Sequence, residues 1–177
     1  MASILRLHPD SACDAVTAIT AEAARPSTGR LALIFRLAGG AGLAIPPPAE
    51  PQRTDGLWRH TCLEAFLRAP DAPAYIELNL SPSGRWAAYA FDGYRAGMRP
   101  AELARPPLTR WRETAEGFEL TADLDLTGAL PPGPWLTGLS AVIEETGGRT
   151  SHWALAHPPG RADFHASDGF ALSLPDA

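Results

Sequence analysis

The stretch Tyr75-Ile-Glu-Leu-Asn-Leu-Ser-Pro-Ser-Gly-Arg-Trp-Ala-Ala-Tyr-Ala-Phe91 reads as two β-strands joined by a tight turn. Successive strand residues point to opposite faces of a sheet, so each face is lined by every second residue. Ser81-Pro-Ser-Gly84 has the composition of a four-residue hairpin loop, because serine, proline and glycine favour turns. The stretch therefore predicts antiparallel strands at Tyr75–Leu80 and Arg85–Phe91.

The length of the loop sets the predicted register of this hairpin. A four-residue loop pairs Leu80 with Arg85 and places Asn79 opposite Trp86. Glu77 then lies on the same face as Asn79 and Trp86. The opposite face becomes a core surface made of Ile76, Leu78, Leu80, Ala87, Tyr89 and Phe91.

A third strand is predicted just before the hairpin, at His60–Arg68. Its alternation places Glu64 beside Asn79 on the neighbouring strand. Phe66 then lies beside Glu77. A slip by one residue would bury Glu64 and expose three apolar positions, so the core pattern supports the same register.

The face of these strands that points away from the core collects polar and aromatic side chains. Asn79 is the only asparagine in the chain, and asparagine is depleted in strands because its amide competes for backbone partners. A tryptophan ring suits the C–H face of a sugar, and carboxylates and amides bind hydroxyls. The face therefore predicts a ligand site, and a solvated sheet face without function is the alternative. Its members are Glu64, Phe66, Glu77, Asn79 and Trp86.

The rest of the chain alternates short apolar runs with turn residues. Eighteen prolines and sixteen glycines favour many short elements. Residues 11–24 fit a helix or a strand, and their β-branched side chains favour a strand. About nine or more strands with little helix predict an all-β fold, a two-sheet antiparallel β-sandwich of immunoglobulin-like type, in one domain spanning residues 1–177. The further strand candidates are Ser3–Leu7, Leu31–Leu37, Phe118–Leu126, Leu136–Glu145, Ser151–Ala156 and Phe170–Leu174.

Composition excludes several classes of function. The net charge is −5 and no basic run occurs, which argues against a nucleic-acid surface. The chain has no lysine, so a lysine base or Schiff base is excluded. The apolar run at the amino terminus is too short for a signal peptide, and no stretch of the sequence reaches the length of a membrane span. Two cysteines are too few for a disulfide framework. A cytoplasmic location without membrane contact is expected.

Four segments of the chain together resemble one family. They are Asp55-Gly-Leu-Trp-Arg-His-Thr-Cys-Leu-Glu-Ala-Phe66 with the hairpin that follows it, Phe91-Asp-Gly-Tyr-Arg-Ala-Gly-Met98, His152-Trp-Ala-Leu-Ala-His-Pro-Pro159 and Asp163-Phe-His165. They resemble the DOMON-like domains of the carbohydrate-binding module family 9-like superfamily, in a bacterial group. The resemblance covers the chain from about Leu31 to Leu174.

The resemblance implies a β-sandwich that binds a sugar or haem and is not itself a catalyst. The resemblance therefore predicts a non-catalytic binding module for a small polar ligand, and a carbohydrate is the expected ligand. Trp58 and Tyr94, on nearby loops, join the face carrying Glu64, Glu77, Asn79 and Trp86. A haem reading would use Met98, the only internal methionine, because related domains bind haem through Met and His ligands.

Other functions stay open from the residues alone. His157, Asp163 and His165 form a loop cluster that could bind a divalent metal ion, as a metal-dependent enzyme or a metal-stabilised protein. Glu64 and Glu77 could act as a glycosidase pair, although exposed carboxylates usually only solvate a sheet. An exposed sheet edge could bind another protein. The sequence leaves the oligomeric state open.

Overall fold

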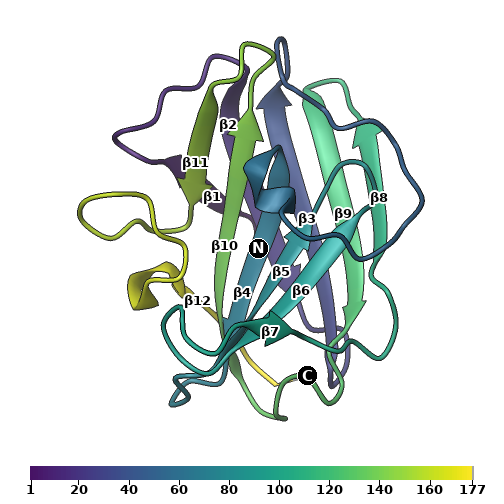
Figure 1. Ribbon diagram of the computed structural model, residues 1–177, viewed down its shortest axis with the longest axis vertical. Coiled ribbons are helices and arrows are strands. Elements are labelled where there is room, and N and C mark those ends of the chain that lie inside the picture. The colour runs from purple at the N-terminus through teal and green to yellow at the C-terminus, as the bar shows by residue number, and fades with distance from the viewer. Residues whose placement is uncertain (177) are drawn as a thin grey trace.

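The structure is a computed structural model, and it describes residues 1–176. These residues form one hydrogen-bonded sheet of twelve strands and two short 3₁₀ turns (Figure 1). The elements are β1 (Ser3–Leu7), β2 (Val16–Ala24), β3 (Arg30–Gly39), η1 (Leu57–Arg59), β4 (Cys62–Arg68), β5 (Tyr75–Leu80), β6 (Trp86–Phe91), β7 (Arg99–Pro100), β8 (Leu108–Glu113), β9 (Gly117–Asp125), β10 (Trp135–Glu144), β11 (Thr150–Ala154), η2 (Ser167–Gly169) and β12 (Leu172–Leu174). None of the helical turns in this range has the length and apolar character needed to cross a membrane.

The twelve strands form one continuous sheet that curls over on itself. Their order is β7-β6-β5-β4-β10-β11-β1-β2-β3-β9-β8, with β12 paired to the start of β10, and all these pairs are antiparallel. The short strand β1 joins the two halves, because Ile4 pairs with Thr20 of β2 while Arg6 pairs with Ala154 of β11. The all-β antiparallel prediction is confirmed. The two sheets expected from the sequence are instead two halves of one sheet.

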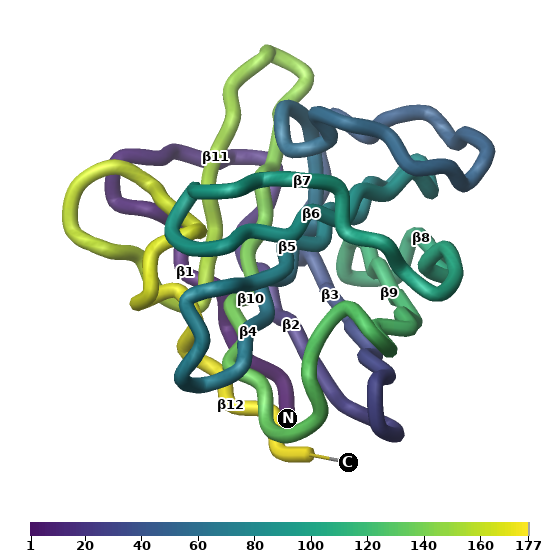
Figure 2. The backbone as a smooth tube through the Cα atoms, turned by 60° about the horizontal axis from the view of Figure 1, so that its bottom comes forward, coloured from purple at the N-terminus to yellow at the C-terminus, as the bar shows by residue number. Residues whose placement is uncertain are grey.

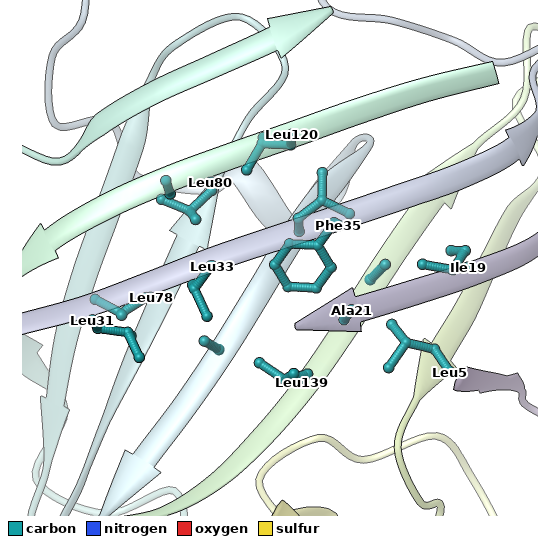
Figure 3. Close-up of a cluster of buried hydrophobic side chains, with 14 of the residues drawn as sticks. Leu5, Ile19, Ala21, Leu31, Leu33, Phe35, Leu78, Leu80, Leu120 and Leu139 are labelled. Atoms are coloured by element: carbon teal, nitrogen blue, oxygen red, sulfur yellow. The ribbon is translucent and has the colours of Figure 1, made fainter. Parts of the chain in front are cut away.

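A single apolar core lies between the two halves of the sheet. Leu33 and Phe35 of β3 and Leu120 of β9 cluster with Leu78 and Leu80 of β5 (Figure 3). All five side chains are at most 1% exposed. Burying a leucine or phenylalanine side chain stabilises a fold by about 1.5–3 kcal/mol, so contacts across the core hold the curled sheet closed.

The opposite, outer face of β4, β5 and β6 is covered as well. Every residue of β5 is buried, and in β4 only Arg68 is partly exposed. A second, smaller aromatic cluster lies on this face, and Phe164 packs against it. The turn η1 contacts β4 and β5, and η2 contacts β10 (Figure 1). The polar face predicted from the sequence is therefore enclosed rather than open to water. The buried members of the aromatic cluster are Phe66, Tyr75, Ala87, Tyr89, Phe91 and Phe170.

Most predicted strands are confirmed, and two edge strands were missed. The ambiguous residues 11–24 contain β2, as their β-branched side chains indicated. The register of β4 with β5 is also confirmed, because Glu64 pairs with Asn79 and Phe66 pairs with Glu77. The strands not predicted are β7 and β8, whose residues are mostly exposed.

The predicted register of the hairpin between β5 and β6 is wrong by one residue. Leu80 pairs with Trp86, so Asn79 faces Ala87 rather than Trp86. The Trp86 side chain consequently points into the core between the two halves of the sheet and is only 9% exposed. Tyr89 moves to the outer face for the same reason.

The hairpin loop accounts for this difference, because it has five residues instead of four. The Ser81 backbone N–H donates to the carbonyl of Arg85 at 3.0 Å and closes the loop one residue later than expected. Inside it, the Ser83 hydroxyl donates to the Ser81 hydroxyl at 2.8 Å, and Gly84 takes a positive φ of 91°. The Trp86 N–H donates outside the hairpin, to the carbonyl of Gln52 at 3.2 Å.

Candidate functional site

A cavity of about 360 Å³ lies on the outer face of β4, β5 and β6. Its floor carries Glu64 and Phe66 from β4, Glu77 from β5, and Tyr89 and Phe91 from β6. This volume falls in the usual range of small-molecule sites. The walls come from η1, the loop between β6 and β7 (residues 92–98), strands β10 and β11, and the segment between β11 and β12 (residues 155–171). The wall residues are Trp58, Arg95, Met98, Val142, His152, Ala162, Phe164 and His165.

Asn79 orients one of the two floor carboxyls. Its Nδ2 donates to Glu77 Oε1 at 2.7 Å, and both residues are buried, with Asn79 0% exposed. The second amide atom, Oδ1, has no hydrogen-bond partner among residues 1–176. Because the side chain is enclosed beside the cavity, we assign Asn79 to positioning Glu77 rather than to contact with a ligand.

Glu64 is the more deeply buried carboxyl of the floor. It is 2% exposed, and its Oε2 accepts a hydrogen bond from the Ser140 hydroxyl at 3.2 Å. Burial, and then the neighbouring Glu77, raise the pKa of Glu64 well above its usual value. Burial also raises the pKa of Glu77, against the hydrogen bond from Asn79. Both carboxyls of the floor therefore hold their protons to higher pH than they would in water.

His165 connects the floor to the aromatic cluster as a neutral side chain. Its Nδ1 lies 2.7 Å from the Tyr75 hydroxyl, which also accepts the Arg95 backbone N–H at 3.2 Å. Its Nε2 is 3.8 Å from Glu77 Oε2. Burial, and then Arg95, lower the pKa of His165 to about 4, so the imidazole is uncharged near neutral pH. The contact with Glu77 is accordingly no ion pair at that pH.

The loop between β6 and β7 runs beside the 155–171 segment (Figure 2), and side chains connect the two. Arg95 Nη2 donates to Asp163 Oδ1 at 2.8 Å, and the Tyr94 hydroxyl donates to Asp163 Oδ2 at 2.5 Å. Arg95 has φ of 51°, and within the described range it is the one non-glycine residue with a positive φ. This conformation costs about 1–2 kcal/mol. The contacts of Arg95 with Tyr75 and Asp163 hold it in place.

Exposed apolar side chains gather at the mouth of the cavity. Trp58 is 48% exposed and Met98 is 58% exposed, and both line it. Tyr94, 63% exposed, lines a neighbouring groove that shares His165 with the cavity. Exposed apolar side chains beside buried polar groups are typical of a ligand site.

The structure brings together part of the predicted site. Glu64, Glu77 and Trp58 line one cavity, and Asn79 lies behind Glu77. Trp86 lies on the other face of the sheet, and its predicted place on the polar face is wrong because the loop has one more residue.

Several lining residues were missed by the sequence analysis. Tyr89 and Phe91 were assigned to the core by the same register error, and a five-residue loop in the sequence reading would have placed both on the polar face. His152 and Phe164 belong to segments far from the hairpin in sequence, and no local pattern points to them. Arg95 stands in a loop for which the sequence offers no periodicity.

The three predicted metal ligands do not form one group. His157 Nε2 lies 2.8 Å from the Arg6 carbonyl oxygen, whereas Asp163 is bound by Tyr94 and Arg95. His165 contacts a tyrosine hydroxyl instead. Across residues 1–176, no three His, Cys, Asp or Glu side chains are grouped closely enough to hold a metal ion. The divalent metal site expected from the sequence thus lacks a ligand set here.

Comparison with known proteins defines the class of fold. No protein-family model and no curated protein sequence matches the chain. A protein from Bacteroides uniformis provisionally described as carbohydrate-binding is similar over 100% of this chain and 86% of its own, with a TM-score of 0.69 and 11% identity. A family 9 carbohydrate-binding module from Caldicellulosiruptor kristjanssonii is similar in complex with cellotriose (TM-score 0.59, 11% identity, 90% of this chain and 74% of that chain).

The same organism provides a family 9 module in complex with glucose, with a TM-score of 0.60, 9% identity and coverage of 98% of this chain and 84% of that chain. The chain therefore has the fold of the family 9 carbohydrate-binding modules. The predicted resemblance is confirmed at the level of the fold.

Proposed function

We propose that the protein is a non-catalytic binding module that holds a small polyhydroxylated ligand, a carbohydrate, in the cavity on the outer face of β4, β5 and β6. The observation that carries the proposal is the combination of two buried carboxyls on the floor with an exposed tryptophan at the mouth. Carboxyl groups accept hydrogen bonds from hydroxyls, and the ring of Trp58 offers an apolar surface to the C–H face of a sugar.

The two floor carboxyls lie on neighbouring strands, and both are buried. Burial raises the pKa of both Glu64 and Glu77. The strands hold the two groups rigidly, which suits recognition of a ligand by fixed hydrogen-bonding groups.

The similar structures guide the choice of first ligands. Two of them hold cellotriose and glucose. Both sugars should be tested by thermal unfolding and by isothermal titration calorimetry. A ligand at 100 times its Kd stabilises the folded state by about 2.7 kcal/mol, which raises the Tm of a domain of this size by about 5–10 °C.

Two variants locate the binding site. Trp58→Ala should weaken sugar binding about tenfold, because it removes the stacking surface at the mouth. Leu108→Ala removes a similarly exposed apolar side chain from β8, in the other half of the sheet, and should leave the affinity unchanged. Equal affinity of the two variants for a sugar that binds the natural chain would refute this site, and lack of binding by sugars of every tested kind would refute the function.

A further inference from the structure

The two floor carboxyls have no cationic partner within the described part of the chain. Glu64 receives one hydrogen bond, from the Ser140 hydroxyl to Oε2, and its Oε1 accepts none. Glu77 receives a hydrogen bond from the Asn79 amide. Buried charges in proteins are normally paired, so an ionised floor needs a positive group from elsewhere.

The cation nearest to the floor is already engaged. Arg95 lines the cavity, but its Nη2 is bound to Asp163 Oδ1 at 2.8 Å, and that carboxylate balances its charge. His165 also lines the cavity and is neutral near pH 7, because its pKa is lowered to about 4. Burial raises the pKa of Glu77 and the charge of Arg95 opposes that rise, but Arg95 also pairs with Asp163, so two ionised floor carboxyls would exceed the positive charge at the cavity.

The rings around the floor favour a cation. Phe66, Tyr89, Phe91 and Phe164 line the cavity beside the carboxyls, and Trp58 stands at its mouth. The face of an aromatic ring carries negative charge density and attracts an ammonium group. A neutral hydroxyl has no comparable electrostatic attraction to the face of an aromatic ring.

We propose that the cavity selects a ligand that carries a protonated amino group on a polyhydroxylated ring, an amino sugar, and that its ammonium group binds between Glu64 and Glu77. An ammonium donates three hydrogen bonds and supplies the missing charge, whereas a neutral hydroxyl supplies only a hydrogen bond. The inference rests on the proposed carbohydrate function and adds a charge to the ligand.

Binding of such a ligand should release protons. Burial favours the protonated form of both carboxyls in the empty cavity, and an ammonium beside them favours the ionised form. An ammonium arriving with its own proton displaces a carboxyl proton to the solvent and leaves a carboxylate beside the ammonium. A neutral sugar brings no charge that would displace a carboxyl proton. The titratable groups that line the cavity are Glu64, Glu77, Tyr89, Arg95, His152 and His165. Cys62 also interacts with both carboxyls, and Tyr75 interacts with Glu77.

Calorimetry at about pH 6 separates these cases. Glucosamine, glucose and N-acetylglucosamine share one ring, and only glucosamine is charged. Glucosamine should bind about tenfold more tightly than the other two, since a charged hydrogen bond is stronger than a neutral one and contacts of the ammonium with the aromatic rings add to it. Titrations in two buffers of different ionisation enthalpy should show proton release with glucosamine alone. This readout uses the unmodified chain.

Glutamine substitutions test the two carboxyls. Glu64→Gln and Glu77→Gln keep the shape of the side chain and should each remove the preference for glucosamine and reduce the proton release. Glu116→Gln makes the same change at an exposed position between β8 and β9 and should alter neither. The two substitutions in the cavity retain a hydrogen-bonding oxygen toward Ser140 or Asn79.

The outcomes separate this inference from the proposed function. Equal affinity for glucose and glucosamine, without proton release, would overturn the amino-sugar inference and leave carbohydrate binding intact. Failure of all three sugars would overturn both. Ethanolamine, an amine without a ring, should bind far more weakly than glucosamine; equal affinity would overturn the sugar part of the inference.

Discussion

Asn79→Asp should destabilise the protein strongly, and increasingly as the pH rises. The substitution preserves the shape of the side chain but replaces the amide that donates to Glu77 Oε1 at 2.7 Å. It also places a third carboxyl in the buried region that already holds Glu64 and Glu77. The perturbation therefore tests both the enclosure of Asn79 and the raised pKa values of its neighbours.

The magnitude follows from two effects. Loss of a buried hydrogen bond costs about 1–3 kcal/mol. Burial beside other carboxyls raises the pKa of the new carboxyl by about 2–3 units, worth about 3–4 kcal/mol when it ionises. Because its pKa is higher in the folded state, the native protein binds more protons, and stability falls as the pH rises from about 4 through the folded pKa. We expect a loss of about 4 kcal/mol or more at pH 8 and about 1–3 kcal/mol near pH 4, where only the lost hydrogen bond counts.

Urea denaturation at both pH values, followed by tryptophan fluorescence, measures the difference. The only glutamine of the chain supplies a matched control: Gln52→Glu makes the same amide-to-acid change at an exposed position and should shift stability by less than about 0.5 kcal/mol. If Asn79→Asp matched that control at pH 8, or if its deficit were independent of pH, the assignment of Asn79 to an enclosed carboxyl cluster would be refuted.

Three further predictions concern stability. The pKa of His165 is lowered to about 4 from 6.5, so the free energy of unfolding should fall by up to about 3 kcal/mol as the pH falls from 6.5 to 4. His165→Gln should remove that part of the acid sensitivity, and parallel pH profiles of the variant and the natural chain would contradict this. Gly117→Ala should destabilise the protein by more than about 2 kcal/mol, because Gly117 has φ of 148° and a Cβ would overlap a backbone carbonyl of β3. Gly147→Ala is the control and should change little, because the space around Gly147 is open. Equal effects of the two substitutions in urea denaturation would count against the β3–β9 geometry. Trp135→Ala should cost about 3–5 kcal/mol in the same assay, because Trp135 is 1% exposed, and a loss below 1 kcal/mol would contradict its burial.

The alternation of side chains in the central strands was sufficient to predict part of the site. In β4 and β5, apolar and polar residues alternate strictly enough that one register alone keeps the leucines in the core. Glu64 and Asn79 are paired as predicted, and Glu77 lies on the same face. In β6 the alternation did not decide which face belongs to the core, because Trp86 and Tyr89 are both aromatic and lie on opposite faces.

The sequence by itself determined most of the strands, the antiparallel all-β class and the face shared by Glu64, Glu77 and Asn79, because these follow from local periodicity. Tertiary structure alone decided three features. Hydrogen bonds from β1 to both β2 and β11 join the expected two sheets into one. The closure of the Ser81–Arg85 loop and the contact of Trp86 with residue 52 turn that tryptophan into the core. Segments distant in sequence cover the polar face, and this burial turns a row of strand side chains into a cavity with raised carboxyl pKa values.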